Sequence, residues 1–168
     1  MNAVTPAANP SRLTPTPDES LPSLESLSPE QPRPTLFSHV KAEDSHFLPG
    51  GLRDFFVYKD LGVAQATHGQ VIAHIAKANL PPTDGTGWHY HVAQFQIVYM
   101  LKGWARFMYE DKPTLVKAGD CVHQRPGIVH YLFDYSPDME YLEIVGPADF
   151  GSIAVEGPCE VPSVTPWN

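Results

Sequence analysis

The sequence predicts an all-β fold, either a barrel or a sandwich of short strands. After residue 49, short runs of apolar or alternating residues recur at regular intervals, separated by turn residues such as Gly, Pro and Asp. No long segment has the 3.6-residue periodicity of an amphipathic helix. At 168 residues the chain is long enough for one domain with a substantial core and too short for two.

The first part of the chain, residues 1–48, is expected to be a disordered arm. Eight prolines occur before residue 35, and each removes a backbone donor and disfavours helix at the preceding residue. The sequence between them is polar and poor in aromatic residues, so it cannot bury enough apolar surface to offset the entropy lost on ordering. We therefore place the folded β-barrel domain at residues 49–168.

The strands of this domain are expected where β-branched and aromatic runs end at turn residues. The run from Trp104 to Tyr109, for example, lies between the Lys102-Gly103 turn and a turn that ends at Pro113. The same pattern predicts strands at residues 55–58, 70–78, 89–91, 94–101, 104–109, 114–116, 121–124, 130–133 and 141–145. A short helical turn is expected at residues 148–150, after which the chain should wrap around the outside of the domain.

Two histidines in one predicted strand, His89 and His91, are separated by a single residue. Alternate residues of a strand project from the same face, so their Cβ atoms are expected about 6.5–7 Å apart. Neutral imidazole is a common ligand of transition metals. A third ligand must come from elsewhere, and His130, which follows a Gly-containing turn later in the chain, is the best candidate. The sequence therefore predicts a metal pocket inside a small β-barrel.

The composition narrows the range of partners. A formal net charge of −8 and a pI near 5.3 argue against nucleic acid and anionic membranes, because both need a basic surface. The two cysteines, Cys121 and Cys159, have no CxxC spacing, which suits a reducing compartment better than a disulfide framework. No apolar run reaches the ~18–20 residues of a membrane span, and no secretory signal is visible. We therefore expect a cytoplasmic protein that binds a small molecule.

Two blocks of sequence resemble the two motifs of the cupin superfamily, and the resemblance covers about residues 52–148. In chain order the blocks are Gly87-Trp88-His89-Tyr90-His91 with Gly103, and Gly119-Asp120 with Pro126-Gly127 and His130. The resemblance implies a single cupin domain, which is a double-stranded β-helix or jelly-roll barrel. It also implies a homodimer that pairs through sheet edges.

The same resemblance implies one divalent transition metal held by His89, His91 and His130, with Fe(II) as the first choice and Mn, Zn, Ni or Cu as the others. The family pattern has a Glu where this chain has Gln96. An amide oxygen can bind a metal, but it is neutral and a weaker donor. Such a site would leave the ion with its full charge and would favour an anionic, chelating ligand. We predict Gln96 as a fourth ligand, directly or through water, with a structural amide as the alternative.

Four further residues are predicted to line the pocket: His74, Tyr99, Phe107 and Glu143. His74 fits either a pocket position or a hydrogen-bonded histidine of the core. Glu143 lies on the last predicted strand, where it faces either the interior or the solvent. Tyr99 and Phe107 are expected as aromatic wall residues rather than as catalytic groups.

Three functions are compatible with this site. The chain has no nucleophile elbow, P-loop or dinucleotide-binding glycine pattern, so any catalysis should depend on the metal. The first hypothesis is a mononuclear metal-dependent oxygenase of the dioxygenase type, acting on a small chelating organic substrate. The second is a non-catalytic module that binds or senses a small ligand. A sugar isomerase or epimerase ranks last, because no histidine base with a facing tyrosine acid stands out.

Overall fold

The computed structural model describes residues 34–83 and 85–167, so the expected arm lies outside the described residues as far as residue 33. Within these residues the chain forms ten strands and one short helix. In chain order they are β1 (Phe56–Asp60), α1 (Val63–Ala66), β2 (Ile72–Ala78), β3 (His89–Val92), β4 (Phe95–Lys102), β5 (Trp104–Tyr109), β6 (Lys112–Lys117), β7 (Cys121–His123), β8 (His130–Tyr135), β9 (Glu140–Gly146) and β10 (Gly151–Ala154).

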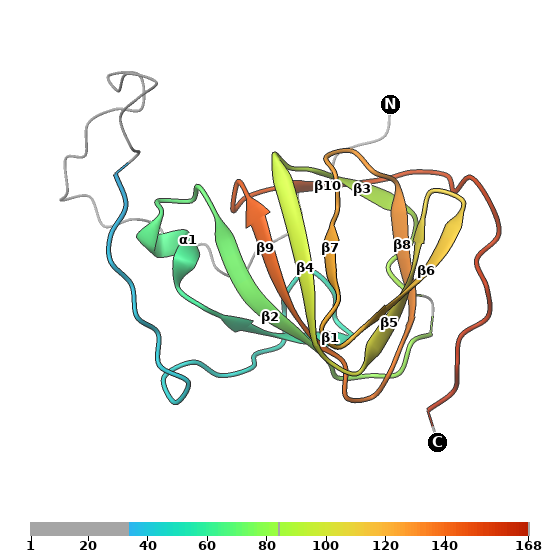
Figure 1. Cartoon of the computed structure of the whole chain (residues 1–168), viewed down its shortest axis with the longest axis horizontal. Coiled ribbons are helices and arrows are strands. Elements are labelled where there is room, and N and C mark those ends of the chain that lie inside the picture. The colour runs from blue at the N-terminus through green and yellow to red at the C-terminus, as the bar shows by residue number, and fades with distance from the viewer. Residues whose placement is uncertain (1–33, 84, 168) are drawn as a thin grey trace.

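The strands form two five-stranded antiparallel sheets in which the chain crosses repeatedly from one sheet to the other. One sheet has the order β1-β2-β9-β4-β7 and the other has the order β10-β3-β8-β5-β6. Figure 1 shows the two sheets as opposite walls of a barrel. The all-β prediction, with a single jelly-roll barrel, is therefore confirmed.

The interior of the barrel contains two apolar clusters. The larger cluster takes residues from both sheets, among them Phe56, Val98, Met100, Phe107, Leu132, Tyr135 and Tyr141. The smaller cluster consists of Ile72, Val145 and Ala148. Burial of these side chains supplies most of the stabilisation of the barrel, at about 25 cal/mol per Å² of apolar surface removed from water.

A layer of buried polar residues separates the two clusters on the first sheet. On β2, His74 lies between Ile72 and Ala76, and on β9, Glu143 lies between Tyr141 and Val145. The strand register places His74 directly opposite Glu143. Because period-two alternation turns these side chains inward, the sheet itself delivers polar groups to the middle of the barrel.

Two differences from the prediction have identifiable reasons. Strand β6 begins at Lys112 and includes Pro113, which was predicted as a turn residue. Proline is tolerated there because β6 is the edge strand of its sheet. After the turn at residues 147–150, the chain forms strand β10, which pairs with β3 and was not predicted.

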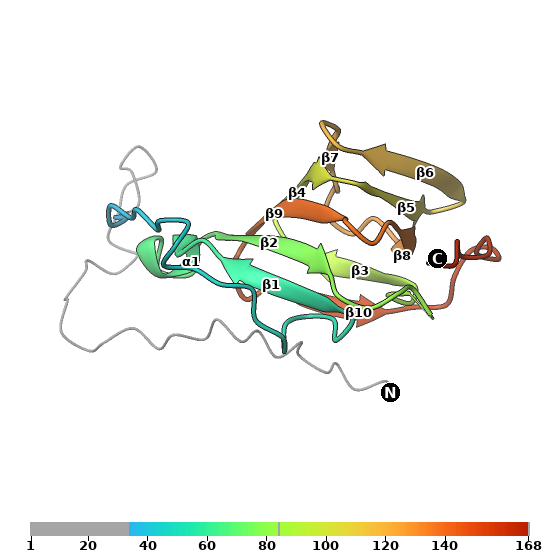
Figure 2. The same cartoon turned by 90° about the horizontal axis from the view of Figure 1, so that it is seen from below.

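The segment from residue 34 to residue 48 runs past α1 and β1 on the outside of the barrel (Figure 2). The Leu36 amide donates to the Ala66 carbonyl at 2.7 Å, and Leu48 forms an isolated bridge with Tyr58. The domain boundary at residue 49 stays a prediction. The helix of the described residues has only four residues, and no described helix is long and apolar enough to cross a membrane.

The C-terminal segment is fixed to the outer side of strand β8 by hydrogen bonds. The backbone amide and the hydroxyl of Thr165 both donate to the Asp134 carboxylate, at 3.0 and 2.8 Å. Asp134 is fully buried and also accepts from Arg106 at 3.3 Å. The indole of Trp167 donates to the Tyr135 carbonyl at 3.0 Å. The C-terminal segment therefore adds two hydrogen bonds to the Asp134 carboxylate and one to the Tyr135 carbonyl of β8.

Candidate metal site

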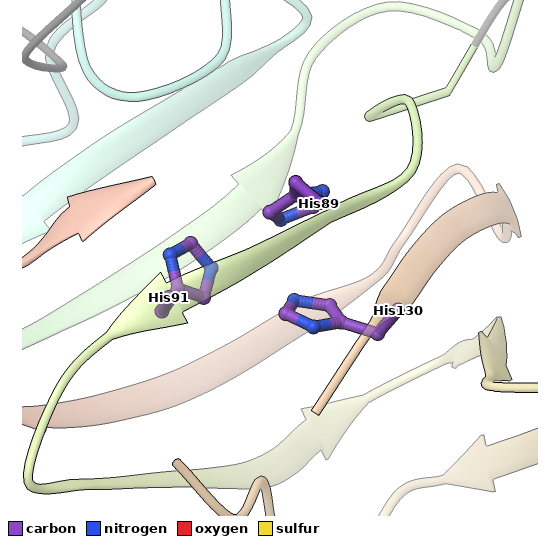
Figure 3. A group of neighbouring side chains, drawn as sticks. All are labelled: His89, His91 and His130. Atoms are coloured by element: carbon purple, nitrogen blue, oxygen red, sulfur yellow. The ribbon is translucent and has the colours of Figure 1, made fainter. Parts of the chain in front are cut away.

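Three buried histidines from two adjacent strands converge inside the barrel. His89 and His91 lie on β3, and His130 lies at the start of β8. The register places His89 directly opposite His130. One ligand nitrogen from each of the three rings lies within 4.8 Å of the other two. Figure 3 shows the three rings pointing toward a common point, as the sequence predicted.

Two of the rings are oriented by backbone carbonyls of the preceding turns. Nδ1 of His89 donates to the Gly87 carbonyl at 2.8 Å, and Nδ1 of His130 donates to the Ile128 carbonyl at 2.9 Å. In each case the acceptor is two residues back in the chain, so the turn and the strand together fix the ring. A donated Nδ1 proton leaves the Nε2 lone pair free to act as a ligand.

The protonation states also suit metal binding. Burial, together with the neighbouring His130 and His91, lowers the pKa of His89 to about 2. Burial and the nearby His130 lower the pKa of His91 to about 4, although Glu143 acts in the opposite direction. Burial also lowers the pKa of His130. All three rings are therefore neutral at pH 7, and neutral imidazole is the form that binds a metal.

The residues present fit a metal ion. The three rings are 3–6% exposed, and one nitrogen of each lies within 4.8 Å of the other two, so the donor set is already gathered at one buried point. Nitrogen ligands around an ion at about 2.0–2.1 Å lie roughly 3–3.5 Å apart, so small side-chain rotations would complete the set. Three imidazole nitrogens suit Zn, Cu, Fe or Ni better than Mg or Ca.

Gln96 lies in the same cavity, but its amide already has a charged partner. Its side chain is 3% exposed, and Nε2 donates to Oε1 of Glu143 at 2.8 Å. The other carboxylate oxygen of Glu143 is 2.7 Å from Nε2 of His74. Because the carboxylate requires a donor, the amide nitrogen must face Glu143, which leaves the Gln96 oxygen as its free acceptor.

Glu143 is a buried carboxylate held in its charged form. Burial alone would raise the pKa of Glu143, but the hydrogen bonds from His74 and Gln96, together with the electrostatic interaction with those neighbours, lower it to about 2. The network of His74, Glu143 and Gln96 therefore places one negative charge beside the three-histidine group, from a strand that the sequence motifs do not cover.

The four predicted lining residues occupy different positions. Phe107 and Glu143 line the cavity. His74 lies behind Glu143, is not among the lining residues, and is the hydrogen-bonded core histidine that the sequence left as an alternative. Tyr99 is not in the cavity: it is 41% exposed, because its neighbours Val98 and Met100 face inward and alternation turns Tyr99 outward.

Sequence reasoning missed Arg53, which lies in the turn before β1 and lines the cavity. Its Nη2 atom is 3.4 Å from Nε2 of His89. Since guanidinium nitrogens only donate, this contact requires an unprotonated Nε2 on His89. Tyr58, Gln124 and Tyr141 also line the cavity. A single arginine in a turn carries no periodic signal, so its position in the cavity could not be predicted.

The fold and the site together define a small jelly-roll barrel with a three-histidine cavity between its sheets. The sequence profile described as the cupin domain matches residues 76–145, which include all three histidines. The profile match therefore places a cupin domain at these residues, in agreement with the expected resemblance.

One curated relative and two solved structures are similar to this chain. An oxalate-binding protein from Thermotoga maritima is 32% identical over 71 residues, which is 42% of this chain and 59% of that protein. The match thus spans less than two thirds of the relative. KdgF from Halomonas is 18% identical with a TM-score of 0.54, covering 66% of this chain and 94% of that one. Pac13 from Streptomyces, a nucleoside dehydratase, is 15% identical with a TM-score of 0.51, covering 76% and 99%. At these identities the two structures show the fold alone.

Proposed function

We propose that the chain is a mononuclear metal-dependent oxygenase of the dioxygenase type, acting on a small anionic chelating substrate. One observation carries the proposal: three neutral, buried imidazoles face one cavity, and no carboxylate stands among them. The nearest carboxylate, Glu143, is already held by His74 and Gln96. An ion bound by neutral ligands keeps its full positive charge, so the site favours a substrate that brings negative charge.

His89, His91 and His130 would hold the ion, with Fe(II) as the first choice and Mn, Zn, Ni or Cu as the others. When bound, the ion would polarise substrate oxygens as a Lewis acid and, in the case of iron, react with dioxygen. Gln96 would orient the substrate or a water molecule through its free amide oxygen. The apolar lining from Phe56, Val98, Phe107 and Leu132 would exclude water from the site.

Oxygen consumption by metal-loaded protein tests this proposal. Purified protein would be loaded anaerobically with Fe(II), mixed with a diketone or a catechol, and exposed to dioxygen in an oxygen electrode. We expect oxygen uptake that matches substrate loss, with isotopically labelled dioxygen recovered in the products. The His130→Ala variant and the metal-free protein should show neither. Absence of uptake with every metal of the series would refute an oxygenase.

A second candidate is a module that binds a small carboxylate without reacting with it. The observation that favours it is the name of the relative at 32% identity, an oxalate-binding protein. Binding without turnover would appear as ligand-induced thermal stabilisation, while the ligand is recovered unchanged. Recovery of oxidised products would rule this candidate out.

We also propose a cytoplasmic homodimer. The proposal for the compartment rests on the two free thiols, Cys121 and Cys159. The proposal for the dimer rests on sheet edges at β1, β7, β10 and β6 that could pair with a second copy. Size-exclusion chromatography with light scattering would measure the mass of the protein in solution. A monomer at micromolar concentration would refute the dimer.

A further inference from the structure

Arg53 projects from the turn before β1 into the cavity of the three histidines. Its backbone amide donates to the Tyr58 hydroxyl at 3.2 Å, which fixes the turn against the first sheet. The guanidinium then reaches across to the second sheet, where Nη2 lies 3.4 Å from Nε2 of His89. The positive charge is thus in direct contact with a nitrogen that we expect to be a metal ligand.

This guanidinium lacks a negative partner. Arg53 forms no salt bridge with any residue that the structure describes, whereas Arg106 and Arg125 pair with Asp134 and Glu110. Its Nε atom is buried and has no hydrogen-bond partner. Arg53 is partly buried, and a cation with reduced access to water and no counter-charge is costly, to which its buried, orphaned donor adds.

The cavity offers no anion of its own that could serve as the partner. Glu143 also lines the cavity, but its two oxygens are engaged by His74 and Gln96. The guanidinium contacts His89 instead, whose imidazole is neutral at pH 7, and the charge of Arg53 is a further cause that lowers the pKa of His89. If the histidines bind a metal, Nε2 of His89 no longer accepts from Arg53, and the guanidinium is left with free donors.

We infer that Arg53 binds the carboxylate of the substrate and so determines its class, an inference that rests on the proposed function of the same site. The ligand would be a small carboxylate with a second oxygen on the adjacent carbon: a 2-oxo acid, a 2-hydroxy acid or oxalate. The planar guanidinium matches the two oxygens of a carboxylate. Because Nη2 and the imidazole lie 3.4 Å apart, a two-carbon unit is long enough to touch both Arg53 and the histidine group.

The test is ligand binding by calorimetry with the full chain, loaded with Zn or Ni so that no turnover occurs. Pyruvate, lactate and oxalate are compared with acetohydroxamic acid, a chelator without a carboxylate, and with inorganic phosphate. The variants are Arg53→Met, which removes the charge, and Arg53→Lys, which keeps the charge but not the planar fork. Arg125→Met is the matched control, because Arg125 is an exposed arginine paired with Glu110 outside the cavity.

We expect Arg53→Met to weaken binding of the carboxylates by roughly 10- to 100-fold, the effect of losing a charged hydrogen-bond partner. Arg53→Lys should lie between this variant and the wild type, and Arg125→Met should match the wild type. Metal content and binding of the hydroxamate should not change. Equal carboxylate affinity in Arg53→Met and the wild type would overturn the inference, as would tighter wild-type binding of phosphate.

These outcomes are separable from those of the proposed function. Carboxylate binding that depends on Arg53, without oxygen uptake by the iron-loaded protein, would reject the oxygenase and support the inference. Oxygen uptake with a diketone, together with equal carboxylate affinity in Arg53→Met and the wild type, would support the oxygenase and reject the inference.

Discussion

Replacing Gln96 with glutamate would test the polar layer of the barrel directly. Gln96 donates to Glu143 at 2.8 Å, and both side chains are almost fully buried, with exposures of 3% and 5%. The Gln96→Glu variant would place a second carboxylate against the first. Two carboxylates at this distance cannot both be charged, so one must take up a proton.

The loss of stability can be estimated from the free-energy cost of protonating one of the two carboxylates. An ordinary glutamate has a pKa near 4.3, so holding it protonated at pH 7 costs about 3–4 kcal/mol. At pH 5 the same proton costs only about 1 kcal/mol. For a domain of this length, the loss at pH 7 corresponds to a melting temperature lower by roughly 10 °C. We expect the difference between variant and wild type to shrink as the pH falls.

Thermal and urea unfolding of the metal-free proteins at pH 7, 6 and 5 would measure this difference. The double variant Gln96→Glu/Glu143→Gln, which restores one acid and one amide, should recover part of the loss at pH 7. A divalent ion should narrow the gap further if the side chain at position 96 faces the ion. A Gln96→Glu variant within about 1 kcal/mol of the wild type at pH 7, or a stability difference that does not vary with pH, would contradict a forced protonation of this pair.

Three further predictions concern the same barrel. In metal analysis by mass spectrometry, His89→Ala and His130→Ala should lose the bound ion, while His123→Ala, at an exposed position on β7, should retain it; equal loss in all three would contradict the site. Since the folded-state pKa values of His89 and His91 lie below the unfolded value near 6.5, stability of the metal-free protein should be greatest above that pH. It should fall by up to about 2 kcal/mol per imidazole on going to pH 5, and a flat profile in urea unfolding would contradict this. Gly103→Ala should destabilise the protein by about 2–4 kcal/mol, because φ is +62° and the new Cβ would lie 2.1 Å from Oγ of Ser136, which accepts from the Trp104 amide. Gly119→Ala, with φ of +93° and open space around the Cβ, should cost only the backbone strain in thermal unfolding, and equal losses in both would show that the contact with Ser136 is unimportant.

Most of the fold could be predicted because its signals are local. Strand β5 was predicted with its observed bounds, Trp104–Tyr109, since alternation and flanking turns define it within the segment itself. Strand β10 was missed because its four residues, Gly151–Ala154, contain two small polar or flexible residues and gain their structure from pairing with β3. Non-local pairing of this kind overrides weak strand propensity.

The same difference between local and non-local signals explains which residues of the candidate site could be predicted. His89 and His91 could be paired from spacing alone, and the cupin resemblance supplied His130. The outward position of Tyr99 follows from strand alternation: Gln96 and Tyr99 are an odd number of positions apart on one strand, so they cannot both face inward. The hydrogen bond between Gln96 and Glu143 could not be predicted from the sequence, because it depends on the pairing of β4 with β9. Arg53 reaches its place through a turn, for which the sequence has no periodic signal.

The docked C-terminal segment has a practical consequence for handling the protein. Terminal residues of a domain can often be removed without effect. Here a chain shortened before Thr165 would lose two hydrogen bonds to the buried Asp134 carboxylate. Arg106 would then be its remaining side-chain partner. Truncations made for crystallisation or for fusion proteins should therefore keep every residue up to Trp167, and any tag should be attached after that residue.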